Sequence, residues 1–239
     1  WAADLAQRGF AVRLTEPELR ARAPHSKARG ARAWWLPRAG RVAAHALVQA
    51  LSTEAERNGA RVATGASVRR VLHDAGRVTG VELSDRTRVE ADTVVLAAGA
   101  WSAQLGAEVG CALPLEQSTR HLFVTRPLGH ADGGFDPRGP IVWDDAAGFY
   151  VRSYDGGLLL CVCDQAPARP DEVAPRYRSD PRVAERASTL ALELLDLAEP
   201  VVIDRGWCGL RDRAPDDRPV LGPDPRLAGL AWCAGLGGH

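Results

Sequence analysis

One short segment of the sequence has the residue types of a ligand-binding turn. Residues 94–100, Val-Val-Leu-Ala-Ala-Gly-Ala, predict a strand that runs into a tight turn of small residues before a helix. Small residues let the backbone approach a cofactor closely, and ligands of doubly wound folds bind at the carboxyl ends of such strands. The start of the following helix favours a phosphate group. Simple close packing of small side chains explains the same residues, so this segment alone leaves both interpretations open.

The remaining reactive side chains form no other recognisable site. The six histidines have no metal-ligand spacing, and no Ser-His-Asp arrangement is apparent. The five cysteines are an odd number without any C-x-x-C pair. Cys161 and Cys163 lie in an apolar run, where alternate residues of a strand share a face. We therefore expect buried thiols in a reducing, cytoplasmic compartment, with neither a disulfide framework nor a bound metal.

Hydrophobic periodicity predicts the elements that would position the turn. Residues 43–58 and 181–197 carry apolar side chains at steps of three and four, which predicts two amphipathic helices. Residues 93–98 predict a strand buried on both faces, as in a parallel sheet, and Asp-Gly-Gly at 155–157 predicts a hairpin turn. Further strands are predicted at 61–64, 67–73, 77–84, 88–91, 139–144, 149–154, 158–163, 201–207, 218–222 and 230–234. The chain is thus expected to be a mixed α/β protein, with an antiparallel segment inserted into a parallel-type core.

Composition excludes several classes of protein. The 239 residues are 46% hydrophobic and 25% charged, as in globular domains. Thirty basic and 30 acidic residues give a net charge of zero, which removes the usual electrostatic case for nucleic acid or an anionic membrane. No apolar run reaches the roughly 20 residues of a membrane span, and no signal peptide is apparent. Because the sequence contains no methionine, we read it as an internal piece of a longer protein.

Three motifs near the end of the sequence carry a resemblance to a known family. They are W-x-G-L-R at 207–211, P-D-x-x-P-V-x-G at 215–222 and A-G-x-G-G at 234–238. With the helix at 43–58 and the turn at 94–100, their order resembles the FAD-dependent amine and amino-acid oxidoreductases of the D-amino-acid oxidase superfamily. Within it the sequence is most similar to D-amino-acid dehydrogenases, D-arginine dehydrogenases and glycine-oxidase-like enzymes. A plain NAD-dependent Rossmann enzyme would have no role for the first and third motifs.

The resemblance implies an α/β fold with a discontinuous FAD-binding Rossmann-like domain and an inserted antiparallel-sheet substrate domain. Residues 1–39 and 110–206 would belong to the substrate domain, and 40–109 and 207–239 to the cofactor domain. The family's N-terminal G-x-G-x-x-G turn is absent, and the final glycine-rich loop stops at His239. We therefore expect the chain as given to bind FAD weakly.

The resemblance also implies roles in binding FAD. The backbone of Val68 would contact the adenine end, and the loop from Gly235 would approach the flavin ring and ribityl chain. The cofactor-binding residues that the resemblance implies are Val68, Ala98, Gly99, Ala100, Gly235, Leu236, Gly237 and Gly238.

A second set of residues would bind substrate by the same resemblance. Arg211 would hold a carboxylate, for which its planar guanidinium is matched. Tyr150 would close the pocket, Arg120 would lie over it, and Arg152 would share the strand face of Tyr150. Ordinary roles remain open for each: an ion-paired surface arginine for Arg211, a plain strand aromatic for Tyr150, and a solvated edge-strand position for Arg120. Cys208 is interpreted as structural, because the flavin-linking cysteine of some relatives would fall one residue later.

The implied reaction is oxidation of the C–N bond of a D-amino acid or secondary amine, by hydride transfer to flavin, giving an imine. The expected partner is therefore a small amine or amino acid. We expect no nucleic-acid partner, no membrane span and no side-chain general base. Two alternatives stay open: a flavin-free, non-catalytic homologue or subunit, and a flavoenzyme of the same fold acting on a polyol phosphate or a modified tRNA base. Zero net charge and Arg211 argue mildly against both.

Overall fold

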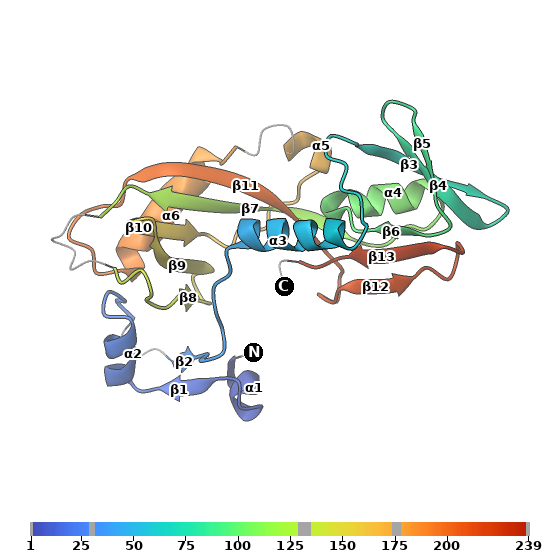
Figure 1. Ribbon diagram of the computed structural model, residues 1–239. Coiled ribbons are helices and arrows are strands. Elements are labelled where there is room, and N and C mark those ends of the chain that lie inside the picture. The colour runs from blue at the N-terminus through green and yellow to red at the C-terminus, as the bar shows by residue number, and fades with distance from the viewer. Residues whose placement is uncertain (1, 29–31, 129–134, 174–177, 238–239) are drawn as a thin grey trace.

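The computed structural model describes residues 2–28, 32–128, 135–173 and 178–237. It contains one five-stranded sheet, two three-stranded sheets and a two-stranded ribbon (Figure 1). The helical elements are α1 (Ala2–Gln7), α2 (Glu16–Arg22), α3 (Ala44–Arg57), the 3₁₀ turn η1 (Gly99–Trp101), α4 (Ser102–Glu108), α5 (Pro170–Val173) and α6 (Pro181–Leu194). The strands are β1 (Val12–Leu14), β2 (Ala33–Trp35), β3 (Val68–Asp74), β4 (Arg77–Leu83), β5 (Arg88–Glu90), β6 (Val94–Leu96), β7 (Glu116–Thr125), β8 (Val142–Asp144), β9 (Phe149–Tyr154), β10 (Gly157–Cys161), β11 (Ile203–Arg213), β12 (Val220–Pro223) and β13 (Leu230–Ala234).

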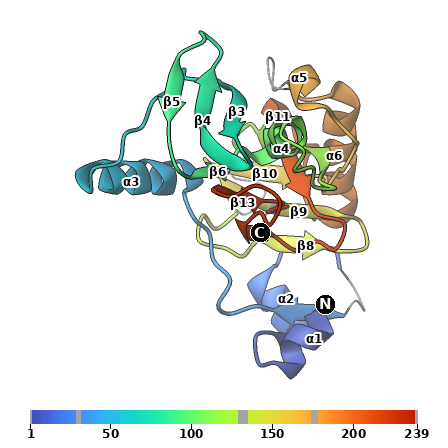
Figure 2. The same cartoon turned by 90° about the vertical axis from the view of Figure 1, so that its right-hand side faces the viewer.

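The five-stranded sheet is antiparallel throughout, in the order β11-β7-β10-β9-β8. Its back face packs on α6, where Phe123, Leu158 and Leu160 are fully buried against Ala187 and Leu190 of the helix. In Figures 1 and 2, α6 and α3 lie on opposite sides of this sheet. We call the side away from α6 the front face.

Strand register decides which side chains share the front face. Arg120 of β7 pairs with Gly209 of β11, and Cys161 of β10 pairs with Leu122 of β7 and Tyr150 of β9. Paired residues of antiparallel strands project to the same side, and alternate residues along a strand do too. The front face therefore carries Arg120, Tyr150, Cys161 and Arg211.

The tight β9–β10 hairpin confirms the turn predicted at 155–157. Tyr154 pairs with Gly157 across a two-residue connection in which Asp155 and Gly156 have φ of 54° and 74°. Two successive positive φ angles are the type I′ geometry that matches the twist of hairpin strands. The turn thereby fixes the register that places Tyr150 opposite Cys161.

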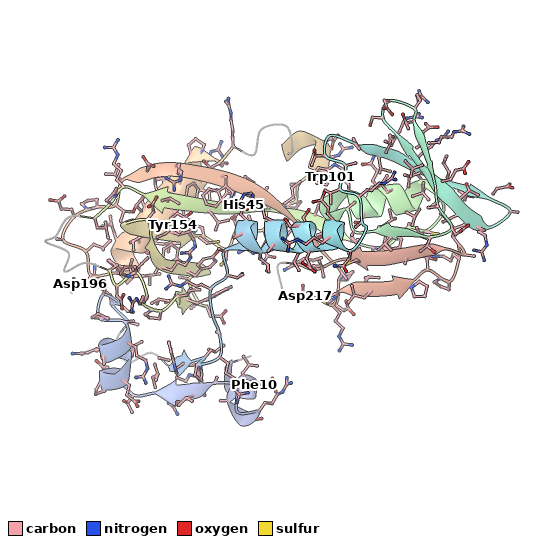
Figure 3. The ribbon with its side chains drawn as sticks, viewed as in Figure 1. Phe10, His45, Trp101, Tyr154, Asp196 and Asp217 are labelled. Carbon is pink, nitrogen blue, oxygen red and sulfur yellow. The ribbon has the colours of Figure 1, made fainter. Side chains whose placement is uncertain are left out.

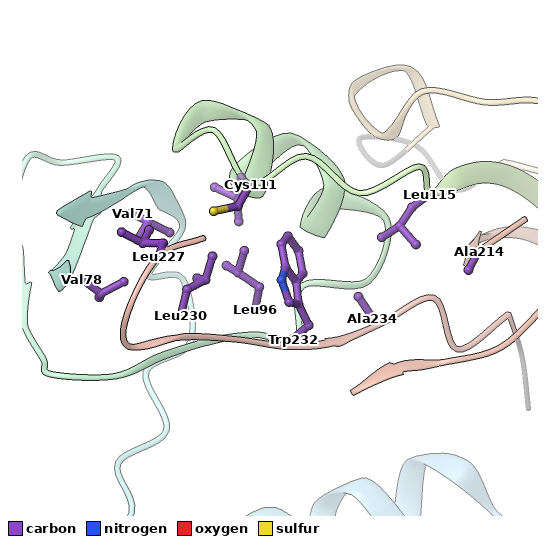
Figure 4. Close-up of a cluster of buried hydrophobic side chains, with 11 residues drawn as sticks. Val71, Val78, Leu96, Cys111, Leu115, Ala214, Leu227, Leu230, Trp232 and Ala234 are labelled. Atoms are coloured by element: carbon purple, nitrogen blue, oxygen red, sulfur yellow. The ribbon is translucent and has the colours of Figure 1, made fainter. Parts of the chain in front are cut away.

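A second core lies under the three-stranded sheet β12-β13-β6, in which β13 runs antiparallel to β12 and parallel to β6. Leu96, Leu230 and Trp232 are buried there with side chains of α4 and β3 (Figure 4). The prediction that residues 93–98 are buried on both faces was wrong, because Val95 is 56% exposed. Helix α4 covers only the side of β6 on which Leu96 lies.

The third sheet, β3-β4-β5, is held together by a buried carboxylate. Glu82 is 3% exposed and forms ion pairs with four arginines, of which Arg69 and Arg70 lie 2.7 and 2.9 Å away. Three predicted strands of this region are confirmed as β3, β4 and β5, but residues 61–64 form no strand. That segment has no neighbouring strand with which to pair among the described residues.

Replacing Glu82 by Gln should remove a pH-dependent part of the stability. Hydrogen bonds from Arg70 and Arg69 lower the pKa of Glu82 to about 2. A carboxyl with a lowered folded pKa adds stability that is complete above its unfolded value, about 4.3, and is lost as pH falls through the folded value. In urea titrations, wild type should unfold at higher urea than Glu82→Gln at pH 6, and the difference should shrink from pH 4.5 to 2. A difference that stays constant over this range would contradict the prediction.

Both predicted amphipathic helices are confirmed, but their surroundings differ. Asp180 caps α6 by accepting a hydrogen bond from the backbone N–H of Arg182, and the apolar stripe of α6 packs on the sheet. None of the residues of α3 is buried, and its Leu47, Val48 and Leu51 are 45 to 64% exposed. Figure 3 labels His45 at the start of α3 and Tyr154 at the end of β9.

Candidate active site

Two arginines without acidic partners lie near each other on the front face, Arg120 on β7 and Arg211 on the edge strand β11. Arg120 is only 6% exposed and its Nε has no hydrogen-bond partner, while Arg211 is half-buried. Among the described residues neither guanidinium forms an ion pair with a carboxylate. Burial, and then the charge of Arg120, lower the pKa of Arg211. Because an uncompensated buried charge is unfavourable, this pair fits an anionic ligand.

The expectation of a solvated edge-strand position for Arg120 was wrong. Strand β7 lies inside the sheet, between β11 and β10. Its sequence, Glu-Gln-Ser-Thr-Arg-His-Leu-Phe-Val-Thr, mixes polar and apolar residues and was not among the predicted strands. On its other face, His121 and Thr119 bind Asp164, which leaves Arg120 on the front.

Tyr150 adds a neutral hydrogen-bond donor beside the arginines. It lies across from Cys161 and interacts with both Cys161 and Arg211. Burial raises the pKa of its phenol, so the hydroxyl keeps its proton at neutral pH. The ring of Trp143 stacks on Tyr150 with centroids 5.4 Å apart. The sequence-predicted trio Arg120, Tyr150 and Arg211 is thus brought together on one face.

A glycine turn wraps around the end of β11 next to Arg211. The Asp212 carboxylate accepts a hydrogen bond from the N–H of Gly235 at 2.7 Å, and the Asp212 carbonyl accepts one from the N–H of Gly237 at 2.8 Å. A guanidinium N–H of Arg211 donates to the carbonyl of Gly237 at 3.2 Å. Positive φ at Gly235 (68°) and Gly237 (60°) gives the turn a shape that suits glycine. Leu236 at its tip is 42% exposed, and Gly238 lies outside the described residues.

The turn predicted at 98–100 lies at the same edge of the β12-β13-β6 sheet as the glycine turn. Strands β6 and β13 are parallel, so their carboxyl ends, which lead to Ala98 and to Gly235, are neighbours. Gly99 has φ of 50° and open space where a Cβ would lie, whereas Ala100 is buried in η1. Val68 is separate: it begins β3 in the third sheet and is 37% exposed.

Arg152 lies on the front face farther from Arg211. Its guanidinium sits 4.8 Å from the ring centroid of Tyr154 and donates to the carbonyl of Ser153. A cavity of about 240 Å³ is lined by Arg152, Tyr154 and Arg41 among others. The arginines Arg120 and Arg211 do not line it.

Two residues of this site were missed by the sequence analysis. Asp212 supports the glycine turn, and its signal was only its position after the W-x-G-L-R motif. Cys163, expected to be buried, is half-exposed and lies opposite Arg120 when the register of β10 and β7 is continued. No spacing in the sequence pairs Cys163 with Arg120, since that placement depends on the register of β10 and β7.

Comparisons with known proteins identify the class to which this arrangement belongs. The family model described as "FAD dependent oxidoreductase" matches residues 1–239, so the chain belongs to that family of flavin-dependent enzymes. The chain is 32% identical over 194 residues to D-amino acid dehydrogenase of Rhizobium johnstonii, covering 79% of this chain and 42% of the relative. It is 31% identical over 159 residues to glycine oxidase of Pseudomonas putida, covering 66% and 40%.

A solved structure supports the fold. L-proline dehydrogenase from P. horikoshii superposes with a TM-score of 0.82, at 20% identity, over 98% of this chain and 61% of that protein. The mixed α/β fold with antiparallel sheets is therefore that of the family. The chain spans less than half the length of the two curated relatives named above.

The residues present fit the flavin that this family uses. Gly99 combines a positive φ with open space at the carboxyl end of β6, and the 235–237 turn lies at the neighbouring end of β13. Small residues at two adjacent strand ends permit close approach by a planar ligand. Among the described residues no group of three metal-ligating side chains occurs, and no helix is long and apolar enough to cross a membrane.

Replacing Asp212 by Ala should weaken flavin retention. The change leaves the buried N–H of Gly235 without an acceptor, at about 1–3 kcal/mol, which corresponds to roughly 5- to 150-fold in affinity if the turn is ordered on binding. FAD titration of the refolded apoprotein, followed by flavin fluorescence, measures the effect. Asp212→Asn is the matched control, since it keeps one acceptor oxygen and should lose less. Equal FAD affinity for Asp212→Ala and wild type would refute a supporting role.

Proposed function

We propose that the protein oxidises the C–N bond of a D-amino acid or a secondary amino acid with FAD as cofactor. The observation that carries the proposal is the pair Arg120 and Arg211, which lacks acidic partners and adjoins the glycine turn. The names of the relatives, D-amino acid dehydrogenase and glycine oxidase, support a substrate with one carboxylate and one amine.

The chain's own residues would bind and orient this substrate. Arg211 would take the carboxylate in a bidentate pair, and the protonated hydroxyl of Tyr150 would donate a further hydrogen bond. Arg120, buried on the neighbouring strand β7, would add positive potential that favours the anion. Holding the carboxylate at a fixed distance from the glycine turn would present the α-hydrogen in one orientation. Bound FAD would supply the hydride acceptor, and the product imine would be hydrolysed by water.

We further propose that the cofactor domain is discontinuous. Residues 40–109 and 207–239 would form its Rossmann-like part, with 1–39 and 110–206 as the substrate domain. The parallel pairing of β6 with β13, which joins residues far apart in sequence, supports this division. Strand β11 would then run from one domain into the other, carrying Arg211 at the junction.

The anaerobic absorption spectrum of the holoenzyme tests the proposed function. A flavin spectrum that bleaches on adding pooled D-amino acids and N-methylglycines would support it, and splitting the pool would name the substrate. For the D-amino acids of the pool, the L-enantiomers serve as the matched control. A flavin spectrum that persists with every amino acid would refute the substrate class, and a purified protein without flavin would favour a non-catalytic homologue.

A further inference from the structure

The front face contains a pair of thiols that the proposed reaction does not use. Cys161 ends β10 and is fully buried, and Cys163 follows two residues later, half-exposed. Both face the side on which Arg120 lies, because the register that pairs Cys161 with Leu122 places Cys163, two residues later, opposite Arg120. A Cβ added at Gly148 would lie 3.8 Å from that of Cys163, so the loop before β9 passes beside it and leaves it half-exposed.

The position of Cys163 is fixed by its neighbour. The Asp164 carboxylate accepts hydrogen bonds from the backbone N–H of His121 at 2.8 Å and from the hydroxyl of Thr119 at 2.9 Å, and it contacts Nδ1 of His121 at 2.7 Å. These contacts tie the segment after β10 to β7. Cys163 is thereby held beside Arg120 and is not free to move away from it.

Charge balance on this face points to an anionic sulfur. Arg120 is buried, its Nε has no partner, and no carboxylate among the described residues pairs with it. If the register of the β10–β7 pairs is continued past Cys161, the side chain opposite Arg120 is the Cys163 thiol. A thiolate there would neutralise the buried guanidinium and accept a hydrogen bond from Cys161.

We propose that Cys163 is a thiolate that fills the anion position beside Arg120 while no carboxylate is bound, and that it is a site of modification by hydrogen peroxide. In that reaction the sulfur attacks one peroxide oxygen, an S–O bond forms and the O–O bond breaks. Hydroxide leaves and is protonated by the buffered solvent to give water. The sulfur is oxidised by two electrons to a sulfenic acid, and the peroxide is reduced.

The surrounding titratable groups agree with this assignment. The neighbouring Cys161 thiol, followed by the charges of Arg120 and Arg211, lowers the pKa of Cys163. Tyr150, which faces the same group from β9, keeps its proton because burial raises its pKa. Burial also raises the pKa of Cys208, on the other face of β11, so that thiol is an internal reference.

A bound carboxylate should suppress the reactivity of Cys163. This step rests on the proposed function, since it requires the substrate anion to lie between the two arginines. The anion would compensate the positive charge of the two arginines, so the pKa of the Cys163 thiol would rise towards its ordinary value of about 8.5. At pH 7 the rate of alkylation should then fall by about tenfold or more.

The experiment is iodoacetamide labelling of the full chain from pH 4.5 to 9, with each cysteine quantified by peptide mass spectrometry. Cys163 should label with a half-maximal rate below pH 8, while Cys208 should label slowly throughout. Arg120→Gln should move the Cys163 midpoint upward by about one unit or more, and Arg120→Lys should restore part of the shift. A wild-type midpoint above pH 8 overturns the proposal, even if the Arg120 variants fail to fold.

Two further arms separate this proposal from the proposed function. Hydrogen peroxide followed by dimedone should tag Cys163 ahead of Cys208, and equal tagging of the two would overturn the modification site. Propionate, a carboxylate without an amine, should protect Cys163 at pH 7. If calorimetry shows that propionate binds and Cys163 is still labelled at the same rate, the proposed competition is overturned. If propionate does not bind, the result counts against the proposed function and does not affect the proposal that Cys163 is a thiolate.

Discussion

Replacing Arg211 by Met should raise the Michaelis constant for the amino-acid substrate by about 30- to 5000-fold, since removing one partner of a buried charge pair is worth about 2–5 kcal/mol. The half-buried guanidinium pairs with no carboxylate among the described residues, so the substrate would be its counter-ion. The effect is expected mainly in kcat/KM, measured by anaerobic flavin reduction with the substrate that the spectral experiment identifies.

Two controls distinguish binding from misfolding. Arg211→Lys keeps the charge but loses the planar fork, so it should recover only part of the affinity. Arg213→Met, two residues later on the same strand, removes an arginine whose partner is the exposed Asp217 at 3.5 Å, and it should change the Michaelis constant little. An unchanged Michaelis constant in Arg211→Met, with normal flavin content, would refute carboxylate binding by this residue.

Replacing Phe123 by Ala should lower the free energy of unfolding by about 3–5 kcal/mol. The ring is fully buried between the five-stranded sheet and α6. Packing around it is tight: a Cβ added at Gly206 would lie 2.5 Å from Cδ1 of Phe123. The empty space left by the ring therefore cannot be refilled from the neighbouring strand without moving the backbone.

Urea unfolding followed by tryptophan fluorescence and by circular dichroism measures this loss. The matched control is Trp143→Ala, an aromatic residue of the same sheet that is 59% exposed and should cost about 1 kcal/mol or less. Similar losses for the two variants would mean that α6 and the sheet do not form the tight core described above.

Local patterns predicted most of the elements. The hairpin at 155–157 was readable because Asp-Gly-Gly has the positive φ angles that a two-residue turn requires. The helix α6 was readable because its apolar residues repeat with the helical period and pack on the sheet. The same period predicted α3, but a period shows only that one side of a helix is apolar and not whether other residues cover it.

Contacts between distant segments were harder to read. Arg120 and Arg211 meet because β7 and β11, whose residues are about 90 positions apart in sequence, pair in one register. No local pattern encodes that register, and the mixed sequence of β7 hid the strand itself. The trio Arg120, Tyr150 and Arg211 therefore came from the family resemblance, while Asp212 and Cys163 emerged only from the folded geometry.

Because side chains alternate between the two faces of β11, this strand should not tolerate the insertion or deletion of a single residue. Arg211 faces the anion site and donates to the carbonyl of Gly237, whereas the carboxylate of Asp212, the next residue, accepts from the N–H of Gly235, so adjacent positions have different roles. Adding or deleting one residue between Trp207 and Arg211 would exchange the two faces, because side chains alternate along a strand. Arg211 would then lie on the face that packs on α6, and the carboxylate of Asp212 would lie on the front face with the thiols of Cys161 and Cys163. Insertions should thus be tolerated in the loop between β11 and β12, where Asp217 is exposed, and not within this strand.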